Sequence, residues 1–211
     1  MLLAASVAAG TASISPISAQ DETAGVNWTV SPVRTHPSQG DVREVEGAQA
    51  ELFTSEEGVT MNFRTTELEA GHVYTAWWVI VNNPENCEAS PCAPAQVLGD
   101  PATLGSEVTF ADGLLVDEAG RMEFAASLAA GEVPEAWYGN GLTNPMGAEI
   151  HIVINDHGPV VPELVGEMLN TLRAACTDDT VPAPYPDNAK ADGTAGTNAC
   201  KLVQFTVFQQ Q

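Results

Sequence analysis

The chain has 211 residues and a formal net charge of −21 at pH 7, from 28 acidic and 7 basic residues. Nucleic acids and anionic membrane surfaces are excluded as partners, because no cluster of Lys and Arg is available to neutralise phosphate groups. Hydrophobic residues make up 44% of the chain, which excludes disorder over most of its length.

The charge also indicates where the protein works. Repulsion among acidic groups destabilises a compact chain, and salt weakens this repulsion. The Debye length falls from about 8 Å at physiological ionic strength to about 3 Å in molar salt. The composition therefore favours a protein adapted to high salt, with an ordinary acidic secreted protein as the alternative. After the N-terminus no apolar run reaches about 18 residues, so no membrane span is expected.

The N-terminal segment, residues 1–20, is apolar and rich in small residues. It ends in Ile17-Ser18-Ala19, just before the polar Asp21-Glu22-Thr23. This pattern predicts a secretory signal peptide over residues 1–20 and one β domain over residues 21–211, in a protein found outside the cell or at its surface. The segment lacks the usual basic start, so an N-terminal helix or tail is the alternative.

Short apolar runs separated by Gly, Pro and Asn follow residue 25. They predict strands over residues 26–34, 47–53, 59–65, 72–82, 107–116, 120–128, 148–155 and 201–208. The strand over 72–82 is apolar on both faces, with Trp77 on one face and Trp78 on the other. We therefore expect it to be central and covered on both sides.

One helix is expected near residues 162–175. Pro162 suits the first helical position, and Leu164, Met168, Leu172 and Cys176 recur every four residues. Residues 177–199 are polar and predict a surface loop. About eight strands and one helix indicate a mainly β fold, either an antiparallel β-sandwich or a small barrel.

Four cysteines agree with an oxidising compartment. Their spacing favours two disulfides, Cys87–Cys92 and Cys176–Cys200, among the three connectivities that four cysteines allow. A zinc site made of all four thiolates is the alternative, but the spacings do not match the usual two-residue pairs.

Reactive side chains concentrate in the predicted strand over residues 148–155 and just after it. Glu149, His151 and His157 share one face, opposite the three isoleucines between residues 150 and 154. Glu149 and His151 lie about 7 Å apart along a strand and could share a divalent metal ion with one outside ligand. His151 and His157 are nearly 20 Å apart in a straight strand, at about 3.3 Å per residue. They can share an ion only if the chain turns or His72 joins them.

Each of these residues also has a plain structural interpretation. His151 fits a half-buried residue hydrogen-bonded to a neighbouring strand, and His157 fits a turn residue bound to a loop carbonyl. His72 and His36 fit surface positions. Trp137 and Tyr138, in a Gly-rich loop, fit either a glycan-binding platform or a loop anchor.

Several motifs resemble an uncharacterised family of exported bacterial and archaeal proteins. They are Tyr74-Thr75-x-Trp77-Trp78-Val79, Asn82-Asn83-Pro84-x-x-Cys87 with Cys92, Ala148-Glu149-x-His151-x-Val153, His157-Gly158-Pro159, and Cys200 before Gln204-Phe205. The resemblance covers most of residues 60–208. It implies export and one shared fold, places His151 and His157 in a recurring motif, and assigns no catalytic role.

These observations predict an exported, salt-adapted β-domain protein that acts as a binding or structural module at the cell surface. A small molecule, a glycan or a second copy of the chain are the partners left open. The alternatives are a small-pocket, metal-assisted enzyme centred on Glu149, His151 and His157, and a subunit of an extracellular assembly. No sequence motif marks an activated nucleophile.

Overall fold

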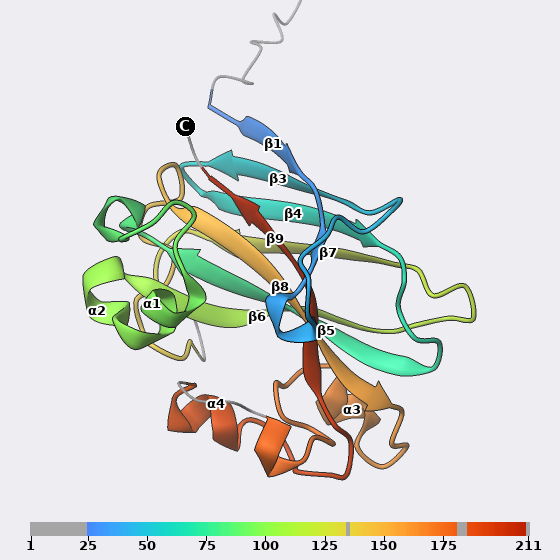
Figure 1. Cartoon of the computed structure of the whole chain (residues 1–211). Helices are drawn as coiled ribbons and strands as arrows, with labels where there is room; N and C mark the ends of the chain where they lie inside the picture. Colours follow the sequence, from blue (N-terminus) through green and yellow to red (C-terminus); the bar gives the residue numbers. More distant parts are fainter. Residues whose placement is uncertain (1–24, 134–135, 181–184, 210–211) are drawn as a thin grey trace, which may run out of the picture.

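The computed structural model describes residues 25–133, 136–180 and 185–209, and the predicted signal peptide lies outside these ranges. Nine strands form two antiparallel sheets (Figure 1). The first sheet has the order β1 (Asn27–Ser31), β3 (Gln49–Ser55), β4 (Gly58–Thr65), β7 (Met122–Ala129). The second has the order β2 (Arg34–Thr35), β9 (Lys201–Phe208), β8 (Glu149–Pro159), β5 (His72–Val81), β6 (Ser106–Leu115).

The main hydrophobic core lies between the two sheets. Phe63 of β4 and Phe124 of β7 meet edge to face there, against Trp78 of β5 and the isoleucines of β8. The described strands do not close into a barrel, so the sandwich form of the predicted fold is the one observed. The alternation along β8 is as expected, because Ile150, Ile152 and Ile154 are all fully buried in this core.

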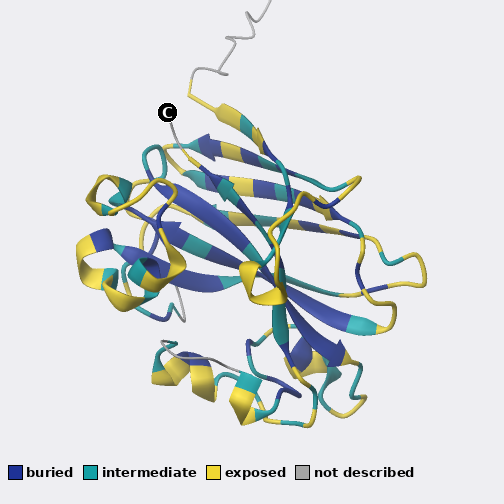
Figure 2. Ribbon diagram, in the orientation of Figure 1, coloured by how far each residue is buried: buried dark blue, intermediate teal, exposed yellow. Residues whose placement is uncertain are grey.

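The outer face of the five-stranded sheet is covered as well. One end of β5 packs at Val81 against α1 (Pro94–Gly99) and α2 (Pro101–Leu104). The other end packs at Val73 against a segment that contains α3 (Val165–Met168). In Figure 2, β5 and β8 are dark blue, the colour of buried residues, along most of their length. The prediction that β5 is buried on both faces is confirmed.

Short helices complete the structure. They are α4 (Asp187–Ala191) and the 3-10 turns η1 (Pro37–Gln39), η2 (Pro84–Asn86) and η3 (Asp178–Thr180). No helix in the described ranges is long and apolar enough to cross a membrane.

The helix expected over residues 162–175 is much shorter, because it is limited to Val165–Met168. The amide groups that would continue the helix bind the loop over residues 192–198 instead: Arg173 N–H donates to Asp192 O and Ala175 N–H donates to Thr194 O. Gly166 also weakens the helix, since glycine is a poor helix former. The four-residue spacing still buries Met168, Leu172 and Cys176, but only Met168 lies in the helix, and the other two lie in irregular backbone after it.

Both favoured disulfides are present, Cys87–Cys92 and Cys176–Cys200. The alternative of a four-thiolate zinc site is therefore wrong. Each bridge lies in one of the two segments that cover the outer face of the five-stranded sheet, so both segments are fastened covalently.

The two bridges should differ in their effect on stability. Cys176 and Cys200 are 24 residues apart, and Cys87 and Cys92 are 5 apart. Because a bridge restricts the unfolded chain more when it closes a longer loop, replacing Cys176 and Cys200 together by alanine should lower the free energy of unfolding by about 3 kcal/mol. The same double change at Cys87 and Cys92 should cost about 2 kcal/mol. Urea unfolding curves of the three proteins measure the difference, and a larger loss at the short bridge would contradict this account.

Candidate functional site

A cavity of about 460 Å³ opens on the outer face of the five-stranded sheet, between the two segments that cover its ends. Its floor is formed by outward-facing residues of four strands: Trp77, Val79, Val108, Val153, Phe205 and Val207. Its walls are formed by α1 and by the loop that contains Trp137. Tyr185, which precedes α4, and His36, which follows β2, complete them. The lining is mostly apolar and aromatic.

Aromatic side chains shape one wall. Trp137 packs on Trp77 with ring centroids 5.2 Å apart, and Tyr185 meets Trp137 edge to face with ring centroids 5.4 Å apart. Trp137 is 9% exposed. It is therefore a packed anchor of its loop and a cavity wall, and it does not form an open aromatic platform of the kind that glycans stack on.

A buried carboxylate holds this wall in place. Glu107 of β6 is fully buried, and its oxygens accept hydrogen bonds from the N–H groups of Val108 (2.9 Å), Tyr138 (3.0 Å) and Asn140 (2.9 Å). These bonds tie the loop over residues 136–141 to the sheet. Trp137 is thereby fixed over the outer face of β5, where it bounds the cavity.

Glu149 and His151 form a buried pair beside the cavity. Both side chains leave the outer face of β8, with Glu149 3% and His151 6% exposed. Their Oε1 and Nε2 atoms are 2.6 Å apart, and the same Oε1 accepts the N–H of Cys92 at 2.8 Å. The partner of His151 was expected on a neighbouring strand. It lies instead on the same strand, because residues two apart share one face.

The hydrogen bonds decide the charge of Glu149. Burial raises the pKa of its carboxyl group, but hydrogen bonding and attraction from His151, with the bonds from Cys92 N–H and Gln209, outweigh burial. The pKa of Glu149 is therefore lowered and the group is ionised at neutral pH. His151 lines the cavity, and its second nitrogen, Nδ1, has no hydrogen-bond partner among the described residues.

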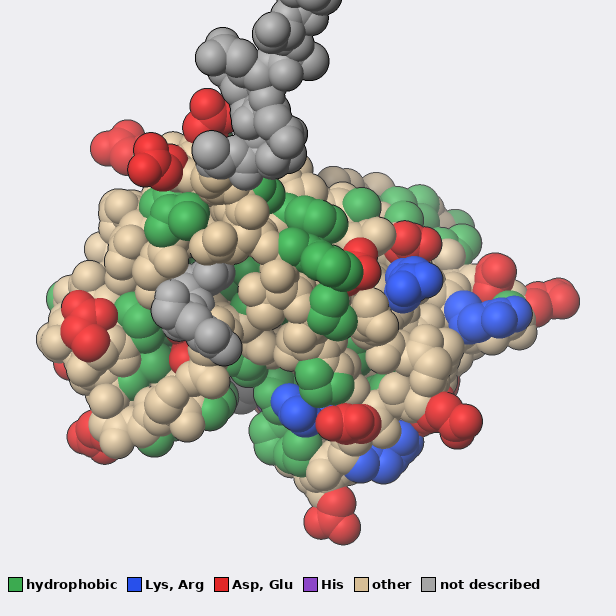
Figure 3. All heavy atoms as spheres, turned by 90° about the horizontal axis from the view of Figure 1, so that it is seen from above, with side chains coloured by type: hydrophobic (Ala, Val, Ile, Leu, Met, Phe, Trp, Pro, Cys, Tyr) green, Lys and Arg blue, Asp and Glu red, His purple; other side chains and the backbone are tan. Residues whose placement is uncertain are grey.

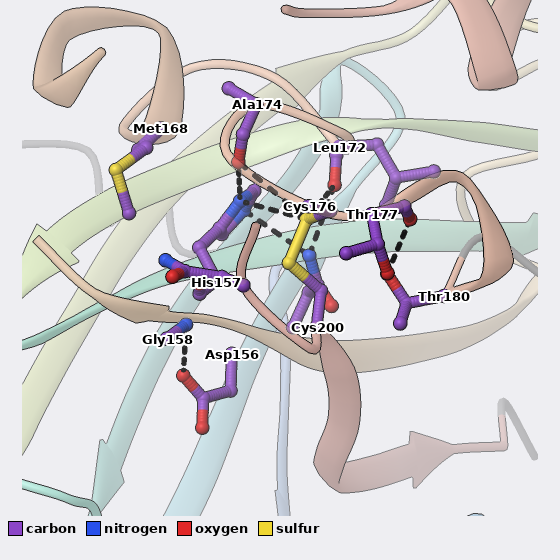
Figure 4. The surroundings of a disulfide bond; sticks show 12 residues. Asp156, His157, Gly158, Met168, Leu172, Ala174, Cys176, Thr177, Thr180 and Cys200 are labelled. Carbon is purple, nitrogen blue, oxygen red and sulfur yellow. Dashed lines mark hydrogen bonds between the residues drawn. A yellow bond between two sulfur atoms is a disulfide. The ribbon is translucent and has the colours of Figure 1, made fainter. Parts of the chain in front are cut away.

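His157 lies in a separate place, beside the Cys176–Cys200 disulfide (Figure 4). Trp77 Nε1–H donates to Thr75 Oγ1 at 2.8 Å, and that hydroxyl donates to His157 Nε2 at 2.9 Å. The other nitrogen, Nδ1, donates to Ala174 O at 3.0 Å. Burial lowers the pKa of His157 and its bonded and charged neighbours offset this only in part, so the ring is a neutral part of the interior. The expected contact with a loop carbonyl is confirmed, but the expected turn position is wrong, because β8 extends through His157 to Pro159.

His72 belongs to a third cluster. Its Nδ1 is 3.0 Å from Asp156 Oδ1, and its ring is 16% exposed, so the expected surface position is wrong. Glu69, His72 and Asp156 have the residue types and closeness of a metal site. However, Lys201 Nζ lies 3.4 Å from Glu69 Oε1 and 3.9 Å from Asp156 Oδ2. The ammonium group of Lys201 therefore already supplies the positive charge that these carboxylates need.

The sequence-predicted candidates thus separate into three clusters, and the pair of Glu149 and His151 is the one that reaches the cavity. In the described part of the chain, the other group with three close metal-ligating side chains joins His157 to Cys176 and Cys200, whose sulfurs are bonded to each other. No third His, Cys, Asp or Glu of that part completes a metal site with Glu149 and His151.

His36 is a cavity residue that sequence reasoning placed at the surface. It is half-buried, its ring meets Phe205 edge to face at 5.9 Å, and its Nδ1 accepts the N–H of Ser38 at 3.2 Å. Burial lowers its pKa. The short strand β2 brings it there by pairing with β9, and a two-residue strand before a proline leaves no periodic signal in a sequence.

Comparison of the chain with protein-family models, curated proteins and solved structures finds no match. The geometry of the cavity is therefore the basis on which a function can be inferred.

The ionised state of Glu149 has a measurable consequence. Glu149→Gln should lower the free energy of unfolding by about 2 kcal/mol at pH 7, because it removes charge-assisted hydrogen bonds. A lowered pKa in the folded state stabilises the protein above the ordinary carboxyl pKa, and this stabilisation is lost as the pH falls through the folded-state pKa. The deficit of the variant should therefore shrink as the pH is lowered below the ordinary carboxyl pKa and through the lowered folded-state pKa of Glu149. Glu56→Gln, at an exposed turn, is the control and should show no such pH-dependent deficit in urea unfolding.

Proposed function

We propose that this protein is an exported, salt-adapted binding module that holds a small and largely apolar molecule in the cavity over β5 and β8. The observation that carries the proposal is the cavity itself. Its volume of about 460 Å³ lies within the usual range of small-molecule sites, and its wall combines apolar and aromatic side chains with a few polar groups. The resemblance to exported proteins is consistent with this role.

The setting outside the cell is supported by covalent and surface features. All four cysteines are paired, which is typical of oxidising compartments. The view in Figure 3 shows acidic side chains scattered over the surface, with fewer basic ones, which lie near acidic neighbours. A dispersed acidic surface of this kind suits a protein that remains folded and soluble in concentrated salt.

Filling the cavity should remove binding. Val153 lies on the cavity floor, so Val153→Trp places a large side chain in the space that a ligand would take. We expect saturable one-to-one binding of the neutral fluorescent probe N-phenyl-1-naphthylamine to the wild type, and an affinity at least about tenfold lower in the variant. Val30→Trp, at an exposed valine of β1, is the matched control and should bind as the wild type does. Equal binding by all three proteins, or none by the wild type, would refute the proposal.

Salt should stabilise the fold through screening of the acidic surface. Raising NaCl from about 0.1 M to about 2 M should increase the urea concentration at the unfolding midpoint. A variant with Asp41→Asn, Glu56→Gln and Glu57→Gln, all at exposed positions, should gain less from the same salt, because fewer negative charges remain to be screened. An equal gain in both proteins would show that the salt acts by another route.

A further inference from the structure

β1 is an edge strand, and no described strand lies against its outer side. It pairs on the inner side with β3, residue for residue from Asn27 to Ser31, and it forms the upper border of its sheet in Figure 1. Its outer side therefore presents backbone N–H and C=O groups that no described strand binds. Such an edge is a template for one more strand.

β1 also lacks the features that keep an edge strand from pairing with another chain, which are charged side chains, prolines and β-bulges. Each of the other three edge strands in the described structure carries a charge, at Arg34 in β2, Asp112 in β6 and Glu123 in β7. β1 has the sequence Asn-Trp-Thr-Val-Ser, with neither charge nor proline, and its register with β3 is unbroken.

The outer face of this edge is apolar and exposed. Val26, just before β1, and Trp28 and Val30 within it are 54%, 62% and 47% exposed, and Trp28 stacks on Phe53 of β3 with ring centroids 6.3 Å apart. These four residues, which we call the β1 patch, are four of the six large hydrophobic residues exposed in the described structure. A concentration of this kind marks a contact surface.

Charge indicates which partner fits the β1 patch. Two copies of a chain with a net charge of −21 repel each other wherever their carboxylates approach. Residues 25–33 contain no charged residue, so this edge allows a close approach. On β3, the patch is flanked by Glu51, which pairs with Val30. If two β1 strands lie side by side, the two Glu51 residues are three strand spacings apart, about 14 Å, which exceeds the Debye length of about 8 Å in physiological salt.

The strand is complementary to itself. When two copies meet antiparallel about Thr29, the middle residue, every residue of β1 gains a partner. Trp28 of one copy then lies opposite Val30 of the other on the outer face, and Asn27 lies opposite Ser31 on the inner face. Apolar side chains thus meet apolar ones and polar side chains meet polar ones. A contact that uses one patch twice closes as a two-fold symmetric dimer.

We propose that two copies of the chain form a symmetric dimer in which their β1 strands pair antiparallel and join two four-stranded sheets into one. This inference is independent of the proposed function, because the cavity lies on the other sheet. Five residues on each side make a small contact, so the dimer belongs to the weak class whose interfaces bury less than about 1,200 Å². Salt strengthens it by screening the repulsion between two acidic molecules.

The mass of the protein in solution tests the dimer. In sedimentation velocity at about 2 M NaCl, the average mass should rise from one chain toward two between about 1 µM and about 300 µM. At about 0.1 M NaCl the dissociation constant should be at least about threefold larger. A mass of one chain at every concentration and salt would overturn the proposal.

Trp28 reports whether β1 forms the contact. The other three tryptophans are at most 9% exposed, so acrylamide quenching of tryptophan fluorescence acts mainly on Trp28. Quenching should fall over the concentration range in which the mass rises, and Trp28→Phe should remove this change. A dimer that leaves the quenching unaltered would place the contact elsewhere. Quenching that is low at every concentration would mean that the chain's own residues cover the patch. Either result contradicts the proposal.

Charges introduced at Val30 test the symmetry of the contact. The two copies of this residue lie diagonally across the proposed pair, about 7–8 Å apart, within reach of long side chains. In about 0.5 M NaCl, which leaves part of the charge interaction unscreened, Val30→Glu alone and Val30→Lys alone should each associate at least about tenfold more weakly than the wild type. An equimolar mixture of the two variants should dimerise again.

Leu115→Glu, at an exposed leucine that ends β6, is the matched control and should dimerise as the wild type does. If neither change at Val30 weakens association, or if the mixture stays monomeric, the pairing of β1 with β1 is overturned. Circular dichroism checks the fold of each variant. If a variant does not fold, the mass and the Trp28 quenching of the wild type still decide.

Discussion

The structure depends on a sheet that is buried on both of its faces. The sandwich core covers one face of β5 and β8, and it does so with regular alternation of apolar residues. The other face carries Val73, Trp77 and Val81 along β5, which must also be kept from water. No third sheet is present among the described residues, so loops and single helical turns provide the second cover. This cover consists of separate segments, and the cavity lies in the gap between the segment that contains α1 and α2 and the segment that contains α3.

Loops cover a sheet stably only if something holds them there. At one end of β5 the Cys87–Cys92 bridge and the helices α1 and α2 do so, and at the other end the Cys176–Cys200 bridge ties down the segment after α3. Between them, Glu107 accepts hydrogen bonds from four backbone N–H groups and fixes Trp137. The cavity is therefore bounded by fastened elements, which favours a binding site that exists before the ligand arrives.

Periodicity explains how much could be predicted from the sequence. The half-buried strands follow from alternation, the two-sided burial of β5 follows from its nearly continuous apolar run, and the two faces of β8 follow from the isoleucines at residues 150, 152 and 154. The four-residue spacing after Pro162 predicted a helix that is mostly absent, because the spacing reports burial and not backbone hydrogen bonding. Long-range pairing with the loop over residues 192–198 decided the backbone there. The cavity itself is made of residues from nine separate segments of the chain, and no local sequence pattern marks the place where they meet.

The candidate site was predicted only in part, because some of its contacts join residues close in the sequence and others join residues far apart. Glu149 and His151 are two apart on one strand, so their contact is local and could be anticipated. The place of His157 depends on its hydrogen bond to Ala174, and that of His72 on its bond to Asp156, which is 84 residues away in the sequence. His36 reaches the cavity through a pairing between β2 and β9 across most of the sequence.

The shortage of basic residues shapes the chemistry of the interior as well as the surface. Three carboxylates are buried in the described structure, those of Glu107, Glu149 and Asp156. Buried carboxylates need hydrogen bonds or positive charge, and arginine is the usual partner where it is available. Here backbone N–H groups satisfy Glu107, and Cys92 N–H and His151 satisfy Glu149. Because backbone N–H groups and an imidazole take the place that a guanidinium would otherwise fill, the fold keeps Glu107 and Glu149 buried without an arginine beside them.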